Sequence, residues 1–199
     1  MAVEREIKLS VVDTFELPSL EGIANVHAAD RGVQQLDATY WDTASLQLMH
    51  TGHGLRFRTA NGMDGRWTLK GASRVEVDAL VREEVEAAGA PERLPSEIAE
   101  RVKTIVEPDE LRPVARLQTS RHIVDLSDDA GPVVEVADDT VRVLDGDAEV
   151  ERFREVEVEL LRDDADVHEV VDRLVSAGAA TPGASSKYVR ALRALGRLP

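Results

Sequence analysis

Three ionisable residues near the N-terminus stand at alternate positions, in the order Glu4-x-Glu6-x-Lys8. Inside a β-strand this spacing puts all three side chains on one face, because successive residues point to opposite sides. Carboxylates at such a spacing can hold a hard divalent cation, and a lysine binds a phosphoryl oxygen as a point charge. The N-terminal strand therefore predicts a charged surface for a metal ion, a phosphate group or both.

The same alternation of charge returns on later segments. It places carboxylates at Glu155, Glu157 and Glu159, two arginines at Arg56 and Arg58, and a mixed pair at Arg82 and Glu84. Arginine pairs with phosphoryl oxygens through two parallel hydrogen bonds, while divalent cations bridge carboxylates to the same oxygens. Basic and acidic rows together are typical of a site for a chain of phosphates with Mg²⁺ or Mn²⁺.

On each of these strands, the face opposite the charged residues is mainly apolar. Polar faces of antiparallel strands usually look at solvent. Here, however, one strand after another repeats Glu-x-Glu or Arg-x-Arg rather than mixed polar residues. We therefore expect a closed barrel whose interior is charged and whose apolar exterior is covered by helices. Such an interior needs water, metal and a polyanion, since unpaired charges in a narrow space are poorly solvated.

Turn residues and hydrophobic periodicity predict an α+β domain built mainly from antiparallel strands. After the N-terminal strand, strands are expected over 32–43, 53–60, 66–71, 79–87, 113–126, 133–137, 140–144 and 150–161. Helices or helical turns are expected over 18–30, 44–51, 95–106, 163–177 and 187–195. The turn-forming run 61–65 predicts a hairpin between two of the strands. Residues 1–199 are expected to form one domain with an eight-stranded closed barrel.

Composition narrows the classes of function. The chain carries a net charge of -14, which disfavours general binding to nucleic acid or to an anionic membrane. The absence of cysteine excludes disulfides, thiolate metal sites and cysteine nucleophiles, so any metal must be held by oxygen or imidazole. No apolar run approaches the roughly 18 residues of a membrane span, and the chain begins with a charged strand. A soluble cytoplasmic protein is therefore expected.

Several different short motifs follow one another from residue 4 to about residue 190. They are Glu4-x-Glu6-x-Lys8, Tyr40-Trp41-Asp42-Thr43, Gly54-Leu55-Arg56-Phe57-Arg58, Thr68-Leu69-Lys70-Gly71, Arg82-x-Glu84, Glu155-x-Glu157-x-Glu159 and Ser186-Lys187-Tyr188. This ordered set resembles the CYTH domain family, the triphosphate tunnel metalloenzymes. The resemblance implies an eight-stranded antiparallel tunnel that binds triphosphate compounds with divalent metals. Members of that family include inorganic triphosphatases, thiamine-triphosphatases and class IV adenylyl cyclases.

The resemblance also implies roles for individual residues. The metal side would consist of Glu4, Glu6, Glu155 and Glu157, and phosphate contacts would come from Lys8, Arg56, Arg58, Lys70, Arg82 and Lys187. Arg121 matches a further basic position, and Arg116 is a weaker candidate. An aspartate also belongs to the metal set: strand parity with Glu135 favours Asp139, whereas a bulge would bring in Asp138. The residues expected to take part directly in catalysis are Glu4, Glu6, Lys8 and Glu157.

Three functions remain open at this point. The first is metal-dependent hydrolysis of a small triphosphate, with inorganic triphosphate giving pyrophosphate and phosphate. The second is an adenylyl cyclase, which ranks lower because no adenine site is recognisable. The third is a non-catalytic module that binds polyphosphate, although intact carboxylates at both ends of the chain favour catalysis. The expected cofactor is Mg²⁺ or Mn²⁺, and the expected partner is a small triphosphate or polyphosphate rather than nucleic acid or a membrane.

Overall fold

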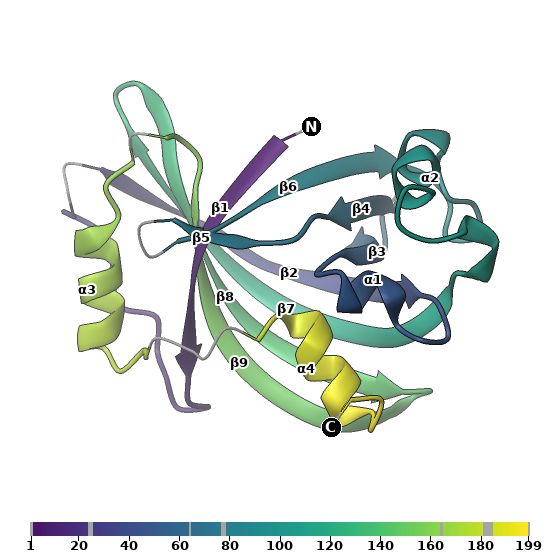
Figure 1. Ribbon diagram of the computed structural model, residues 1–199. Coiled ribbons are helices and arrows are strands. Elements are labelled where there is room, and N and C mark those ends of the chain that lie inside the picture. Colours follow the sequence, from purple (N-terminus) through teal and green to yellow (C-terminus); the bar gives the residue numbers. More distant parts are fainter. Residues whose placement is uncertain are drawn as a thin grey trace.

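Antiparallel strands curve into a barrel in the computed structural model (Figure 1), which describes residues 2–23, 26–63, 65–76, 79–163, 165–180 and 185–198. The strands are β1 (Ala2–Val11), β2 (His27–Asp42), β3 (Gly54–Ala60), β4 (Arg66–Lys70), β5 (Arg74–Glu76), β6 (Ala79–Ala88), β7 (Arg112–Asp128), β8 (Gly131–Asp145) and β9 (Ala148–Leu160). The helices are α1 (Gln47–His50), α2 (Ser96–Val102), α3 (His168–Ser176) and α4 (Lys187–Ala194), with a 3₁₀ turn at Pro108–Glu110. Within these described ranges, no helix combines the length and the apolar character needed to cross a membrane.

The barrel closes because the two ends of the strand series pair with each other. The order around it is β1-β9-β8-β7-β2-β3-β4-β6, and β6 pairs antiparallel with β1. β5 extends the sheet from β6 and stands outside this circuit. The predicted closed eight-stranded antiparallel barrel is therefore confirmed. Closure also sets β1 between β6 and β9, where Glu4 lies opposite Arg82 and Lys8 lies opposite Glu157.

Two apolar clusters cover the outer face of the barrel. α3 packs over β8 and β9, where Val136, Val156 and Val158 are fully buried. α2 packs over β3 and β4, and its Ile98 is buried in one cluster with Leu55. Burying a side chain of this size contributes roughly 1.5–3 kcal/mol of transfer free energy. Because of this packing, the apolar faces of the strands point outward and their charged faces point into the interior of the barrel.

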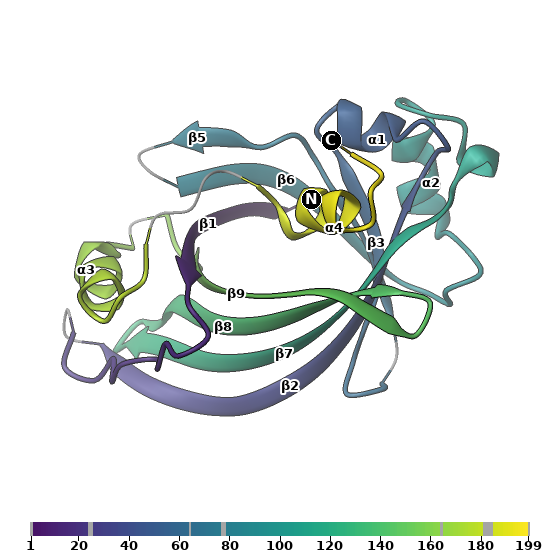
Figure 2. The same ribbon diagram turned by 90° about the horizontal axis from the view of Figure 1, so that it is seen from below.

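α4 takes a different position from α2 and α3. Its Tyr188 and Leu192 share an apolar cluster with Val141 of β8 and Phe153 of β9. Phe153 lies on the same strand face as Glu155, because the two residues are two positions apart. In Figure 2, α4 lies on the concave side of β7, β8 and β9, between β9 and β6. Helices cover the exterior as expected for α2 and α3, whereas α4 covers part of the inner face.

The helix expected over 18–30 is wrong for the residues that the structure describes. Residues 18–20 are irregular, and β2 has begun by residue 27. Leu20 and Ile23 have a helical spacing, yet both reach the outer α3 cluster from a segment without helical hydrogen bonding. Arg154 holds the preceding stretch in place by donating hydrogen bonds to the carbonyls of Asp13 and Phe15. Residues 24 and 25 lie outside the described ranges.

The two strands expected over 133–137 and 140–144 are one continuous strand, β8. Asp138 and Asp139 continue the ladders with β7 and β9 in regular register. Aspartate is depleted in strands, but each of these carboxylates has an arginine on its own side of the sheet: Arg154 for Asp138 and Arg121 for Asp139. Paired in this way, the two aspartates do not interrupt the strand. The short strand β5 has no counterpart among the predicted elements.

Candidate active site

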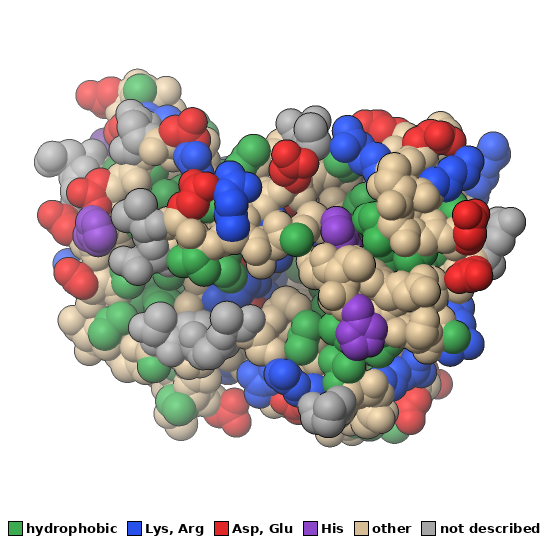
Figure 3. Space-filling view, viewed as in Figure 1, with side chains coloured by type: hydrophobic (Ala, Val, Ile, Leu, Met, Phe, Trp, Pro, Cys, Tyr) green, Lys and Arg blue, Asp and Glu red, His purple; other side chains and the backbone are tan. Residues whose placement is uncertain are grey.

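The interior of the barrel is a charged cavity of about 1160 Å³. Most residues assigned from the sequence line it, namely Glu4, Lys8, Arg56, Arg58, Lys70, Arg82, Arg121, Asp139, Glu157 and Lys187. Glu6 and Glu155 are buried beside the cavity and pair with lysines that line it. On the face drawn in Figure 3, basic side chains are visible in a recess near the centre. The fold thus brings residues from both ends of the chain into one site.

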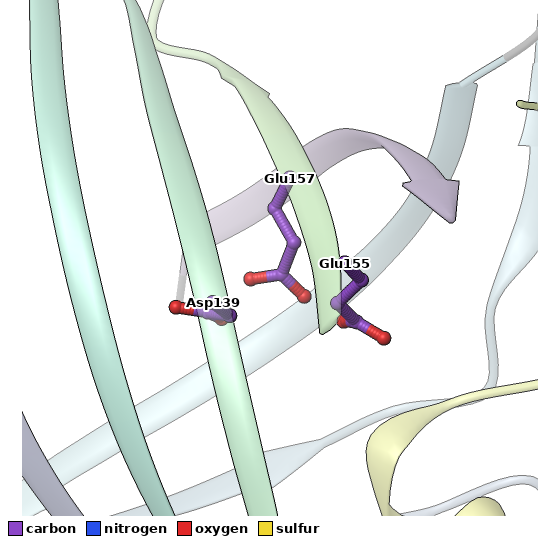
Figure 4. A group of neighbouring side chains, drawn as sticks. All are labelled: Asp139, Glu155 and Glu157. Atoms are coloured by element: carbon purple, nitrogen blue, oxygen red, sulfur yellow. The ribbon is translucent and has the colours of Figure 1, made fainter. Parts of the chain in front are cut away.

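Three carboxylates from β8 and β9 form a tight cluster in the cavity wall (Figure 4). Ligand atoms of Asp139, Glu155 and Glu157 all lie within 4.8 Å of one another. Three basic side chains pair with this cluster, namely Lys8, Arg121 and Lys187. The cluster therefore carries as many positive groups as negative ones.

The distances in this central cluster are those of strong ion pairs. Lys187 Nζ lies 2.9 Å from Asp139 and 2.7 Å from Glu157. Lys8 Nζ lies 2.6 Å from Glu157. Arg121 spans two of the carboxylates, with 2.6 Å to Asp139 and 2.6 Å to Glu157. Charge-assisted contacts of this length fix the side chains relative to one another.

These contacts also shift the pKa values of the cluster. Burial alone would raise the pKa of Glu157, but Lys187, Lys8 and Arg121 hold it well below its usual range. Burial would likewise lower the pKa of Lys187, but Asp139, Glu157 and Glu155 raise it well above its usual range. Both groups therefore stay charged at neutral pH.

A second network links β1, β4 and β6. Arg82 lies 2.5 Å from Glu4 and 2.7 Å from Glu6. Lys70 Nζ lies 3.1 Å from Glu4 and 2.5 Å from Glu84. Burial opposes ionisation of Glu4, but Lys70 and Arg82 lower its pKa far below the usual value. In this network, as in the central cluster, the basic side chains balance most of the charge of the carboxylates.

Arg56 and Arg58 of β3 differ from the other cavity cations. Within the described ranges, neither guanidinium forms an ion pair with a carboxylate, and the buried Nε of Arg56 has no hydrogen-bond partner. The neighbouring Arg56, followed by burial and Arg121, lowers the pKa of Arg58 to about 10. Arg58 remains protonated at neutral pH, so β3 presents uncompensated positive charge to the cavity. Such charge suits an anion that is not part of the protein.

Glu135 and Glu159 form the acidic counterpart of these arginines. They lie opposite each other on β8 and β9, and both line the cavity. In the part of the chain that the structure describes, neither carboxylate pairs with a basic side chain. Burial, then Glu4 and Glu135, raises the pKa of Glu159 to about 7, and burial also raises the pKa of Glu135. Neither residue is given a role in the site by the sequence motifs, although Glu159 belongs to the carboxylate row and strand parity with Glu157 and Asp139 places both on the inner face.

The structure separates the two aspartates between which the sequence left the choice open. Asp139 is fully buried against the cavity, as strand parity with Glu135 predicts. Asp138 lies on the opposite face of β8, where Arg154 donates hydrogen bonds of 3.0 and 2.8 Å to its two oxygens. Including Asp138 among the metal ligands is wrong, because the fully described strand has no bulge that would turn it inward. Arg116, the weaker phosphate candidate, pairs with Asp37 outside the cavity.

The sequence of this barrel matches a known protein family. A family model described as the CYTH domain matches residues 2–180. The chain belongs to the CYTH domain family. Two relatives from two strains of Mycobacterium tuberculosis, both described as uncharacterized proteins, are 34% identical over 218 residues, covering 99% of this chain and 42% of theirs. The chain thus spans less than half the length of these curated relatives.

Solved structures share the CYTH barrel at low sequence identity. A candidate adenylyl cyclase from Hippeastrum, described as having a dominant triphosphatase activity, superposes with a TM-score of 0.64 at 18% identity, covering 98% of this chain and 97% of that one. A candidate adenylate cyclase of Bacillus halodurans gives a TM-score of 0.63 at 18% identity, covering 96% and 98%. At these identities the comparison shows a common fold.

Two groups of carboxylates in this CYTH tunnel could hold a divalent cation. The central cluster has closely spaced oxygens but is already neutralised by three basic side chains. Glu135 and Glu159 lack such partners in the described chain, and Glu6 lies opposite Glu159 on the neighbouring strand. Oxygen-only donors whose negative charge is uncompensated fit Mg²⁺ or Mn²⁺ well. Asp139, Glu155 and Glu157 thus offer the closest oxygens, and Glu135 and Glu159 offer carboxylates without a basic ion-pair partner in the described chain.

Proposed function

We propose that this CYTH protein hydrolyses a small triphosphate with the help of Mg²⁺ or Mn²⁺. The reaction we assign is the attack of water on inorganic triphosphate to give pyrophosphate and phosphate. One observation carries the proposal: the same cavity contains two arginines, Arg56 and Arg58, and two glutamates, Glu135 and Glu159, that form no ion pair within the described chain. A phosphate chain with a bound cation satisfies both pairs at once, which neither an anion nor a cation alone does.

The arrangement of the strands supports this assignment. β3 and β9 are separated by three strands in either direction around the barrel, so the arginines and Glu159 belong to opposite walls. A linear triphosphate could bridge those walls, with one end at the arginines and the cation side at the glutamates. Holding the phosphates in this way supplies positioning and charge stabilisation, the main sources of catalysis in phosphoryl transfer.

Each group of side chains then has a distinct task. Arg56 and Arg58 bind the phosphates that do not react, through paired hydrogen bonds. Lys8 and Lys187, held by Glu157, contribute fixed positive charge in the middle of the tunnel. A divalent cation bound by the unpaired glutamates would polarise the scissile phosphoryl group. A glutamate at that wall orients the attacking water by accepting a hydrogen bond.

A panel of substrates tests this proposal. Phosphate release is measured from inorganic triphosphate, thiamine triphosphate and ATP, with Mg²⁺, with Mn²⁺ and with EDTA, next to an assay for cyclic AMP. We expect release of phosphate from inorganic triphosphate that stops in EDTA and returns with added metal. Undiminished turnover in excess EDTA would remove the metal from the proposal. Cyclic AMP from ATP would assign a cyclase instead, and tight binding without turnover would assign a binding module.

A further inference from the structure

Lys187 differs from the other tunnel cations in the element that carries it. Lys8, Arg82 and Arg121 belong to barrel strands, whose ladders fix their positions. Lys187 is the first residue of α4, which is not part of the sheet. Its ammonium group nevertheless reaches the central carboxylate cluster, and the Lys187 side chain is only 12% exposed. The position of this charge therefore depends on how the first turn of α4 is held.

The next residue, Tyr188, joins that turn to the barrel wall. Its hydroxyl donates a hydrogen bond of 2.8 Å to Oδ2 of Asp42, at the end of β2. Its ring stacks on Tyr40, with 4.7 Å between the centroids and 3° between the planes. Asp42 is fully buried and Tyr188 is 5% exposed, so water does not compete for this bond.

Asp42 is itself held rigidly by the backbone amides of Thr43 and of α1. Its Oδ1 accepts hydrogen bonds from the amides of Thr43 and Leu48 at 2.7 and 2.9 Å, and its Oδ2 accepts one from Met49 at 3.0 Å. A carboxylate fixed by three backbone donors cannot follow a moving helix. Burial and the neighbouring Asp42 also raise the pKa of Tyr188, which keeps its hydroxyl a donor.

We propose that Tyr188 is a positioning residue that keeps Lys187 in the tunnel. The bond between Tyr188 and Asp42 fixes the first turn of α4, so that Lys187 Nζ stays among Asp139, Glu155 and Glu157. Without it, the turn shifts and the ammonium group leaves the cluster part of the time. The apolar packing of Leu192 and Ala191 still keeps the rest of α4 in place.

The small number of lysines in this chain gives a direct test that needs no substrate. The four lysines are Lys8, Lys70, Lys103 and Lys187, and Lys103 is an internal standard because its side chain is 54% exposed. Amine acetylation of each lysine is followed by mass spectrometry in the wild type and in Tyr188→Phe, which keeps the ring stack and removes the hydroxyl. We expect the labelling rate of Lys187 to rise roughly tenfold, as for a lost hydrogen bond to a charged partner. Lys8 and Lys70, which lie on strands, should keep their rates.

Arg190→Ala is the matched control on the same helix. Arg190 pairs with Glu151 at 2.7 Å and lies over the ring of Phe153 at 3.8 Å, so its removal loosens α4 without touching Asp42. We expect a lower melting temperature with unchanged labelling of Lys187. Equal labelling in both variants, or no change in a folded Tyr188→Phe protein, would overturn the proposal. If Tyr188→Phe does not fold, Asp42→Asn replaces it: its neutral amide oxygen accepts the tyrosine hydrogen bond more weakly, so the labelling of Lys187 should rise by a smaller factor, and no rise would overturn the proposal.

A second test rests on the proposed function and uses inorganic triphosphate as the probe. Its affinity is measured by calorimetry in EDTA for the wild type, Tyr188→Phe, Lys187→Met and the double variant. If Tyr188 acts through Lys187, its substitution weakens binding about three- to tenfold in the wild-type background and not in Lys187→Met. Equal losses in both backgrounds would contradict the positioning role. If the wild type binds triphosphate neither in EDTA nor with Mg²⁺, the proposed function fails, while the lysine labelling still decides the role of Tyr188.

Discussion

The charged residues of the tunnel differ in what compensates them. Glu157 contacts Lys8, Arg121 and Lys187, so its negative charge is part of an internal balance. Arg58 has no such partner in the described chain, and its charge is available to a ligand. Substituting the first therefore disturbs the other side chains of the site, whereas substituting the second removes only a ligand contact.

Glu157→Gln should separate turnover from binding. The amide keeps the size of the side chain but loses the charge that holds three cations in place. We expect kcat for inorganic triphosphate to fall roughly 10²-fold or more, because the reacting groups are no longer fixed. Triphosphate should still bind, since the basic side chains remain. Initial rates and calorimetry on the same preparation test this, and a wild-type rate would show that Glu157 has no part in the reaction.

Arg58→Ala should instead weaken the binding of triphosphate itself. The substitution removes a charge-assisted phosphate contact worth about 1.5–3 kcal/mol. Calorimetry with inorganic triphosphate gives the change in affinity. Arg116→Ala is the control, because Arg116 pairs with Asp37 outside the cavity. An unchanged affinity for Arg58→Ala, or an equal loss for Arg116→Ala, would place the phosphate site elsewhere.

Glu159→Gln should stabilise the protein in EDTA in a pH-dependent way. The folded state raises the pKa of Glu159 from 4.5 to about 7, so the folded protein holds this proton more tightly than the unfolded chain. Wild-type stability is therefore lost progressively as the pH rises from about 4.5 to about 7, and the glutamine variant escapes this loss. After allowance for partial exposure, we expect a gain on the order of 1–2 kcal/mol at pH 8 and none at pH 4. Urea unfolding at both pH values measures it, and an equal gain at both would refute the assigned cause.

At the scale of the elements, the alternation of side chains along each strand allows the sequence to predict which charged residues point into the site. The alternation of Glu4, Glu6 and Lys8, and of Arg56 with Arg58, places these residues correctly on inner faces, because period-two geometry is local. Two features depend on packing between distant segments and are not local. One is the inward position of α4. The other is which carboxylates lack a basic ion-pair partner, as Glu159 does among the described residues.

The hairpin of β3 and β4, which carries Arg56 and Arg58, depends on a glycine at its turn. A Cβ at Gly65 would lie 1.9 Å from Cζ of Phe57, whose ring packs against Trp67 at 5.4 Å. Gly65→Ala should therefore lower stability by roughly 1–3 kcal/mol through overpacking. Thermal melting tests this, with Phe57→Leu in the same background as the rescue that restores space. A melting temperature equal to that of the wild type would mean that the turn accommodates the methyl group.

At the scale of the whole molecule, charge is distributed unevenly. The chain has a net charge of -14, yet three of its four lysines lie in the tunnel. Among the described residues, the arginines of β3 and Glu135 and Glu159 of β8 and β9 line one cavity without ion-pair partners. Ligands that fill both pairs should therefore stabilise the barrel as a unit, since they connect opposite walls.

The melting temperature of Glu157→Gln measures how strongly a ligand connects the two walls, because this slow variant does not consume the triphosphate during the experiment. Inorganic triphosphate with Mg²⁺ at about 100 times its dissociation constant should add about 2.7 kcal/mol of stability, by mass action. For a chain of this size that corresponds to a rise in melting temperature of roughly 5–10 °C. Mg²⁺ alone should give a smaller rise, because it satisfies the glutamates and leaves the arginines unpaired. Sulfate at matched ionic strength controls for salt, and adding Arg58→Ala should reduce the rise with triphosphate but not the rise with Mg²⁺. If sulfate reproduces the full effect of triphosphate with Mg²⁺, the two pairs do not act together on one ligand.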